Sequence, residues 1–283
     1  MSQRRMDNAS VFATVAIGAA VLAMVVMVAA AFGAFRSDGA DASSPEDEQV
    51  ADDGAVADPN ARATDVVDSA ASAMAGVTSV EFRLQRDGAP IFIDEFQRIA
   101  LDSLRGQFSV PGKAQAELEV TVNDNLATRL GAVAVDDEVW ISNPVTGDFE
   151  TLPAGYDIDP SKFFDPENGW QPLLANLQNV TMVGVDDRGG ERYHLTGTAP
   201  AEQVSDITVG LVQGQDVTVD FWIHPGTYLV TAAEFETTID GGTSDWNLEL
   251  DHYGDTFTIE PPANVRETQD QSAPDQTEAS SDG

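Results

Sequence analysis

The chain has 283 residues, of which 48 are acidic and 14 are lysine or arginine, so its formal net charge is −34. This acidity disfavours association with a phosphate backbone, and we therefore expect no nucleic-acid partner. Cysteine is absent from the sequence, which excludes disulfide bonds, thiolate metal sites and a lipid anchor attached through a cysteine side chain.

The N-terminal region contains an apolar run, residues 11–35, without a charged side chain. As a helix it would measure about 37 Å, which exceeds the roughly 30 Å hydrocarbon core of a bilayer. Arg4 and Arg5 precede this run, and the chain after it is acidic. The positive-inside rule predicts a cytoplasmic segment at 1–10, a single transmembrane helix at 11–35 and an extracytoplasmic remainder in the cell membrane. Small residues near the end of the run also suit a signal peptidase, so cleavage stays the alternative.

Two segments of the chain are predicted to be unstructured. Residues 36–63 are acidic, rich in Ala, Ser, Asp and Pro, and show no apolar periodicity; residues 267–283 have the same character. Such segments bury too little apolar surface to offset the entropy of ordering the chain. We predict a disordered linker at 36–63, a disordered tail at 267–283 and one folded domain at 64–266.

The folded region opens with a helical pattern and continues with the period-two alternation of β-strands. Thr64 is the expected N-cap, and one helix face is formed by Val66, Val67, Ala70, Met74 and Val77. Alternation of apolar and polar residues predicts strands at 80–85, 116–121, 130–135, 139–141, 193–196, 217–224, 231–239, 246–250 and 257–259. Short helical patterns follow Pro166 and Pro200.

This order of elements predicts an α+β fold, a curved antiparallel sheet of about ten or eleven strands that forms a half-barrel. A few helices are expected over the concave face, with an apolar cavity between helices and sheet, because modest helices cover only part of such a face. The candidate cavity-lining residues are Phe82, Leu84, Leu118, Val120, Val139, Ile141, Phe221, Ile223, Phe235 and Leu248. Alternation does not separate a cavity wall from a filled core, so both interpretations stay open for each residue.

Motifs for catalysis and cofactor binding are missing from the sequence. It contains no nucleophile elbow, phosphate loop, dinucleotide fingerprint or HExxH motif, so we expect no enzyme activity, no cofactor and no metal. The histidines at 194, 224 and 252 are expected as solvated side chains near strand ends. An acidic cluster within residues 157–168 lacks the spacing of an EF-hand and is interpreted as an ordinary loop.

Three of the tryptophans have an orientation that alternation predicts. Trp140 and Trp222 fall opposite the apolar face of their strands, whereas Trp246 shares a face with Leu248 and Leu250. Packing is the favoured role for these rings, and a rim around an apolar opening is the alternative.

Four blocks of the sequence together resemble a known family. They are FFDPENGWQPLLANLQNV (163–180), YHLTGTAPAEQV (193–204), VDFWIHPGTYLVTAAEFE (219–236) and LDHYGDTFTIEPP (250–262). In order and spacing they are similar to the mycobacterial lipoprotein family that includes LppX, LprA, LprF and LprG, and the resemblance covers residues 64–265. It implies a curved half-barrel with an apolar cavity, related to the carriers LolA and LolB. It also implies binding of acylated lipids or glycolipids and their transfer through the cell envelope.

The sequence departs from that family in lacking the acylated cysteine, and the helix at 11–35 would replace this anchor. The strong negative charge favours neutral or zwitterionic acyl lipids as ligands. The leading hypothesis is therefore a membrane-anchored, extracytoplasmic lipid-binding protein. An envelope sensor or protein-interaction module on the same fold is the alternative, although a cytoplasmic segment at 1–10 leaves little surface for a signalling partner.

Overall fold

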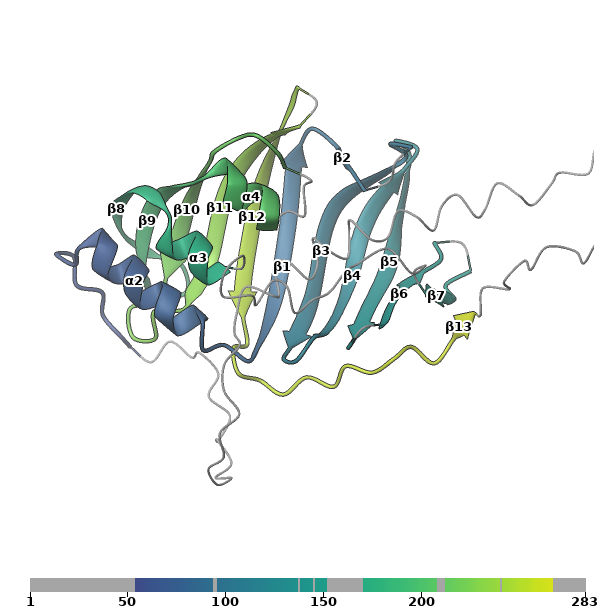
Figure 1. The fold of residues 1–283 in the computed structure, drawn as a ribbon, viewed down its shortest axis with the longest axis horizontal. Coiled ribbons are helices and arrows are strands. Elements are labelled where there is room, and N and C mark those ends of the chain that lie inside the picture. Colours follow the sequence, from purple (N-terminus) through teal and green to yellow (C-terminus); the bar gives the residue numbers. More distant parts are fainter. Residues whose placement is uncertain are drawn as a thin grey trace, which may run out of the picture.

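The structure is a computed structural model that describes residues 54–93, 96–136, 138–144, 146–151, 170–207, 212–239 and 241–266. Within these residues it contains three helices and a thirteen-stranded sheet (Figure 1). The helices are α2 (Ala63–Met74), α3 (Trp170–Ala175) and α4 (Ala201–Ile207). The strands are β1 (Ser79–Gly88), β2 (Ile91–Phe92), β3 (Ile99–Ser109), β4 (Lys113–Val122), β5 (Leu126–Val135), β6 (Glu138–Ser142), β7 (Phe149–Thr151), β8 (Gln178–Asp187), β9 (Glu191–Ala199), β10 (Val217–Ile223), β11 (Val230–Ile239), β12 (Gly242–Asp251) and β13 (Val265–Arg266).

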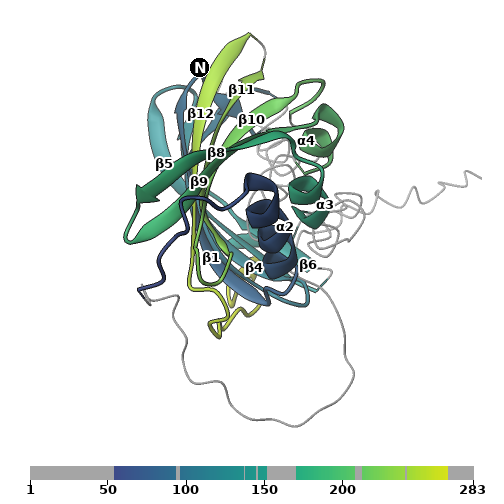
Figure 2. The ribbon, with the colours of Figure 1, turned by 90° about the vertical axis from the view of Figure 1, so that its left-hand side faces the viewer.

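The sheet is open and curved, as Figures 1 and 2 show, and its strand order is β13-β7-β6-β5-β4-β3-β1-β12-β11-β10-β9-β8. Every pairing is antiparallel except that of β13 with β7, and β2 adds to the side of β3. The predicted curved antiparallel sheet with few helices is thereby confirmed. The sheet has more strands than predicted because two-residue strands, β2 and β13, extend it. The strand predicted at 257–259 is wrong, since that segment is extended chain outside the sheet.

Helix α2 forms because its apolar residues fall on one face, and that face is buried. Val66, Val67, Ala70 and Met74 are all buried, as predicted. The predicted N-cap is wrong by two residues, since Arg62 occupies that position and offers no capping side-chain hydrogen bond. Instead its guanidinium pairs with Asp65 at 2.8 Å, which places a carboxylate in the first turn, where the helix dipole favours it. Helix α2 packs against α3 and β8.

The antiparallel register places apolar residues in rows across the inner face of the sheet, the face toward the helices. One such row crosses eight strands and consists of Leu195, Phe221, Ala233, Leu248, Leu84, Leu104, Leu118 and Leu130. The neighbouring row on the opposite, outer face consists of His194, Trp222, Ala232, Glu249, Arg83, Arg105, Glu117 and Gly131. The inner row and the buried face of α2 belong to one hydrophobic core.

The described chain begins before the predicted domain. Ala57 is buried, its N–H donates to Glu191 Oε2 at 2.8 Å, and the N–H of Asp58 donates to the Tyr193 hydroxyl at 3.0 Å. Residues 54–62 therefore lie against β9, and the folded region starts ahead of Thr64. None of the described helices is long and apolar enough to cross a membrane. The predicted segments at 1–10, 11–35 and 267–283 lie outside the described residues.

The C-terminal segment 252–266 runs as a strap from the middle of the sheet to its far edge (Figure 1). At its start, Ser79 Oγ donates to the carbonyl oxygen of Asp255 at 2.7 Å. At its end, the N–H of Phe149 donates to the Asn264 carbonyl at 3.0 Å, and Arg266 pairs with Asp148 at 2.7 Å. The strap thus contacts β1 at one end and β7 at the other, and it forms no strand pairing with the strands between them.

Gly106 in β3 tests how closely the inner face is packed. A Cβ at this position would lie 2.3 Å from the Gln115 carbonyl oxygen and 2.6 Å from Phe82 Cζ. We expect Gly106→Ala to lower the free energy of unfolding by about 3 kcal/mol, because the neighbouring backbone must move. The matched control is Gly184→Ala in β8, where a Cβ meets nothing within 4 Å. Urea unfolding of both variants measures the difference, and equal stabilities would contradict this account of the packing.

Candidate binding faces of the sheet

The ten predicted cavity-lining residues all belong to one apolar face. Eight of them are buried, and Ile141 and Phe235 are partly buried against the same core. The register pairs two of them directly, Leu84 with Leu248, and pairs others with further apolar residues of the neighbouring strand, such as Val139 with Ala134. Alternation alone grouped these residues within each strand. The structure brings the groups of all these strands together on the inner face.

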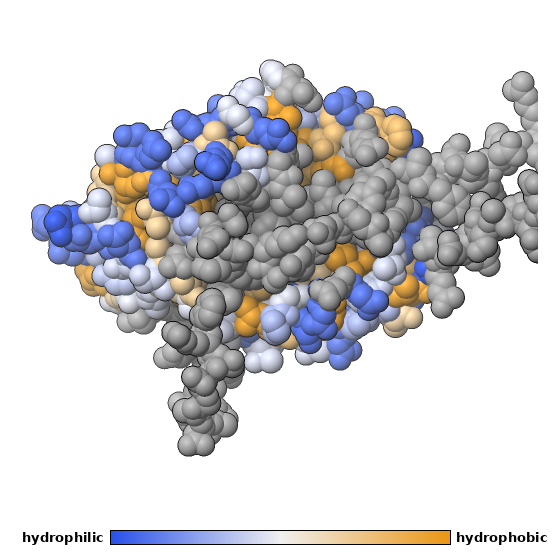
Figure 3. Space-filling view, viewed as in Figure 1, coloured by the Kyte–Doolittle hydropathy of each residue, from blue (hydrophilic) through white to orange (hydrophobic). Residues whose placement is uncertain are grey.

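The inner face changes in side-chain size along the sheet. In β9–β12, which lie under the helices, it carries large residues such as Phe221, Leu248 and Trp246. In β3–β5 a band of small residues crosses the same face, namely Gly106, Ala114, Ala116, Ala132 and Ala134. Helices α2, α3 and α4 lie over β8–β12 and do not reach over β4–β6 (Figure 1). Figure 3 shows hydrophobic residues on this side at the upper ends of β3–β5.

A buried tyrosine joins the helix to the helix-covered half of the sheet. The Tyr253 hydroxyl donates to the Val230 carbonyl and contacts Met74 Sδ in α2. Burial, with a smaller contribution from Asp251, raises the pKa of this phenol well above its ordinary value. The neutral hydroxyl is therefore the form that the fold requires.

The outer face carries charged pairs on β1, β3, β4, β5 and β12. Arg83 pairs with Glu249 at 2.9 Å, Arg105 with Glu117 at 2.9 Å and Arg129 with Glu119 at 3.1 Å. All six side chains are more than a third exposed, so each pair stabilises the fold only slightly. Hydrogen bonds from Ser103 and Arg129 lower the pKa of Glu119.

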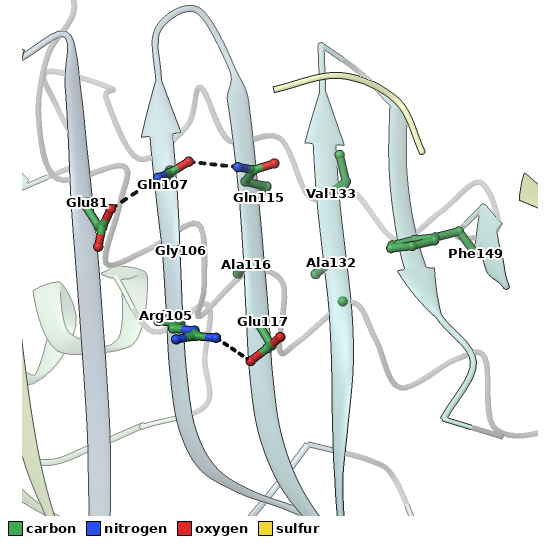
Figure 4. A pocket seen from close by; sticks show the side chains of 11 residues that line it. Glu81, Arg105, Gly106, Gln107, Gln115, Ala116, Glu117, Ala132, Val133 and Phe149 are labelled. Carbon is green, nitrogen blue, oxygen red and sulfur yellow. Dashed lines mark hydrogen bonds and ion pairs between the residues drawn. The ribbon is translucent and has the colours of Figure 1, made fainter. Parts of the chain in front are cut away.

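A hollow of about 410 Å³ lies on the outer face above β3–β5 (Figure 4). A chain of hydrogen bonds crosses it, in which Gln107 Nε2 donates to Glu81 at 3.2 Å and Gln115 Nε2 donates to Gln107 Oε1 at 2.8 Å. The Phe149 ring closes one side and lies over Gly131, where a Cβ would be 2.9 Å from Phe149 Cζ. Its polar groups already bond to one another, so the hollow has no evident unsatisfied donor.

A second hollow, of about 420 Å³, lies on the outer face beside the turn between β8 and β9. Its basic lining residues are Arg83, Arg188 and Arg192, and its floor includes Ala232. Arg188 lies over the Trp222 ring, 3.9 Å from the centroid, and pairs with Glu234 at 2.6 Å. Sequence reasoning missed this hollow because the turn residues approach Arg83 only in the folded sheet.

The histidine prediction is wrong for two of the three residues. His194 is largely buried between Asp186, at 2.8 Å, and Asp220, at 3.1 Å, and its ring stacks on Trp222. His224 is buried, and its Nδ1 accepts the N–H of Thr227 at 3.1 Å, which closes the turn after β10. Both rings are satisfied by local hydrogen bonds, a role that residue type and alternation do not reveal.

The described residues contain no grouping of three or more histidine, aspartate and glutamate side chains that could hold a metal ion. The acidic cluster within 157–168 lies outside the described residues. The tryptophan orientations are confirmed for the described rings: Trp140 and Trp222 lie in outer-face positions, whereas Trp246 belongs to the core.

The family model of the LppX_LprAFG lipoproteins matches residues 62–259, which is most of the described chain. The chain belongs to the LppX_LprAFG lipoprotein family. The resemblance on which the sequence analysis relied is thereby confirmed. Unlike a lipoprotein with a lipidated cysteine, this member has no cysteine. No match was found among curated protein sequences.

Solved structures agree on the fold. LprF from Mycobacterium bovis is similar with a TM-score of 0.54 at 19% identity, over 71% of this chain and 96% of that protein. LppX from Mycobacterium tuberculosis is similar with a TM-score of 0.50 at 17% identity, over 70% of this chain and 98% of that protein. A LolA superfamily protein from Nitrosomonas europaea aligns over 68% of this chain at 11% identity with a TM-score of only 0.24, which is too low to support a shared fold.

Substitution of Tyr253 tests the buried contact between its hydroxyl, the Val230 carbonyl and Met74 in α2. We expect Tyr253→Phe to lower the free energy of unfolding at pH 7 by about 1–2 kcal/mol, because the Val230 carbonyl loses a buried donor. Above about pH 10 the unfolded chain releases the phenol proton before the folded chain does. The unmodified protein should then lose up to about 1.4 kcal/mol per pH unit more than the variant. Denaturant unfolding between pH 7 and pH 11 measures both effects; identical slopes above pH 10 would contradict the assignment.

Proposed function

We propose that the domain binds acyl chains of a lipid or glycolipid on the inner face of the sheet and takes part in lipid transfer through the cell envelope. We also propose that residues 11–35 hold it at the cell membrane with the domain on the extracytoplasmic side. Membership of the LppX_LprAFG lipoprotein family supports the first proposal. The apolar run and the arginines before it support the second.

The band of small residues on β3–β5 is the observation that carries the lipid proposal. The space at Gly106 is already taken by Phe82, but the alanines of the band, Ala114, Ala116, Ala132 and Ala134, extend little beyond the strand backbones. We propose that acyl chains occupy the space over these alanines. Removal of apolar surface from water supplies about 25 cal/mol per Å², and such sites need few polar contacts. We therefore assign Leu118, Val120, Val139 and Ile141 to the wall of the lipid site.

The remaining candidate residues divide by their position relative to the helices. Phe221, Ile223, Phe235 and Leu248 lie in strands under α2–α4, and we assign them to a filled core (Figure 2). Phe82 and Leu84 on β1 lie between the two regions and border the small-residue band, since Phe82 pairs with Gly106. Binding of this kind requires no catalytic group, and we propose no enzymatic activity.

The direct test is native mass spectrometry with lipid extraction on the full chain purified from its source organism. Co-purification of a stoichiometric acyl lipid supports the proposal. Chain that is repeatedly free of lipid, together with one stoichiometric protein partner in a pull-down, would instead support the alternative of a protein-interaction module.

Two alanine substitutions separate the lipid site from the filled core. Ala132 and Ala233 are both buried on the inner face, but Ala132 lies in the small-residue band, whereas Ala233 pairs with Phe221 and Leu248. We expect Ala233→Phe to cost about 3 kcal/mol of unfolding free energy through overpacking. Ala132→Phe should instead cost less than about 1 kcal/mol and lower the amount of bound lipid about five-fold or more, because its ring occupies ligand space.

Lipid content per mole of protein and urea unfolding are measured together for both variants. The assignment fails if Ala132→Phe is destabilised as much as Ala233→Phe, or if it keeps the full amount of lipid.

A further inference from the structure

The hollow beside the β8–β9 turn differs in charge from the rest of the molecule. The chain has 48 acidic and only 14 basic side chains, yet three arginines, Arg83, Arg188 and Arg192, line this one space of about 420 Å³. It opens on the outer face, opposite the side on which lipid binding is proposed. Glu81, Glu249 and Asp251 line the same space, so its formal charges balance, whereas the chain as a whole is strongly acidic. A guanidinium keeps its charge in a protein.

Arg192 is the residue of this hollow whose charge is least compensated. Its exposure is 6%, and its Nη1 and Nη2 donate to the carbonyl oxygens of Glu191 at 2.8 Å and Gly189 at 3.3 Å. Its Nε has no hydrogen-bond partner, and none of the described ion pairs includes Arg192. Because both acceptors are neutral, a buried positive charge remains, and burial of such a charge is costly until an anion approaches.

The carboxylates that share the hollow already accept hydrogen bonds from other groups. Glu249 pairs with Arg83 at 2.9 Å, and Glu81 accepts from Gln107 Nε2 at 3.2 Å. Asp251 accepts the backbone N–H of His252 at 2.7 Å. None of these three carboxylates forms a described ion pair with Arg192, whose two acceptors are neutral carbonyl oxygens.

The neighbouring arginines are held in place at the rim. Arg188 is fixed by stacking on Trp222, 3.9 Å from the ring centroid, and by its ion pair with Glu234. Arg83 lies in the row of outer-face residues, with Glu249 on one neighbouring strand and Arg105 on the other. Guanidinium forks fixed in this way match the paired oxygens of phosphate and carboxylate groups.

We propose that this hollow is a binding site for an oxyanion, a phosphate or carboxylate group that is either free or part of a lipid headgroup. The ligand contacts the guanidinium groups of Arg83 and Arg188 at the rim and offsets the buried charge of Arg192. The site is separate from the acyl-binding face, because the sheet lies between them. Whether or not an oxyanion binds here, the proposal of lipid binding on the inner face is therefore unaffected.

The test is isothermal titration calorimetry of the full chain in a non-ionic detergent, with inorganic phosphate and glycerol 3-phosphate as probes. We expect one phosphate per chain, with affinity at least about ten-fold weaker in Arg192→Gln and in Arg83→Gln. The matched control is Arg105→Gln, which removes another exposed, ion-paired arginine of the outer face from outside this hollow and should bind as the unmodified protein does. Tighter binding of glycerol 3-phosphate than of inorganic phosphate identifies a headgroup as the source of the anion, and the reverse order identifies a free anion.

Arg192 also donates to carbonyl oxygens at the β8–β9 turn, so its substitution could disturb that turn. Arg83→Gln is therefore measured as well, because the Arg83 side chain is half exposed. Circular dichroism establishes that each variant is folded before titration. The proposal is overturned if neither probe binds the unmodified protein. It is equally overturned if Arg105→Gln weakens binding as much as Arg83→Gln does, since the effect would then be one of general charge.

Discussion

The antiparallel register is the constraint on which the rest of the structure depends. One pairing of strands places Leu84 beside both Leu104 and Leu248, and the same pairing places Arg83 beside both Arg105 and Glu249. A slip by one residue in β1 would move charged side chains into the core and apolar ones to the surface. The apolar inner face and the polar outer face are therefore consequences of a single alignment, and both proposed sites require it.

Differences in side-chain size then divide the inner face, which is mostly apolar, into two regions. Under the helices, Phe221 and Trp246 fill the space between sheet and α2–α4 as in any close-packed core. On β3–β5 the row that contains Phe221 continues with leucines, and the small residues lie in the neighbouring rows, where Gly106 pairs with Ala116 and Ala116 with Ala132. At Gly106 the space is taken by Phe82, so a methyl group would not fit. The inner face thus has one half in which large side chains pack under the helices and another half, on β3–β5, that includes a band of small side chains, where we propose that the apolar ligand binds.

The sequence predicted the strands wherever alternation was unbroken and missed those in which it was interrupted. Strand β3 was not predicted because a bulge at Asp102 places the inner residues Leu101 and Leu104 three positions apart. Strand β8 was missed for a similar reason, since its register shifts at two points and it lies at the edge of the sheet. All ten candidate lining residues share the inner face, because period two is sufficient to group them there, and their role as lining of a lipid site stays a prediction.

Division of those residues between wall and core needed the positions of the helices, which depend on contacts distant in the sequence. The cluster of Arg83, Arg188 and Arg192 also lay beyond prediction, because 109 positions separate its first and last members and only the strand order of the folded sheet brings them to one hollow.

The attachment of residues 54–62 to β9 also has a mechanical consequence. A domain held at its N-terminus receives tension where the chain first contacts it, which here is the pair of hydrogen bonds from Ala57 to Glu191 and from Asp58 to Tyr193. Four strands, β10, β11, β12 and β1, separate that point from β3. If residues 11–35 anchor the domain as proposed, we expect a pulling force to act first on the helix-covered half of the sheet, so that β3–β5 keep their arrangement under load.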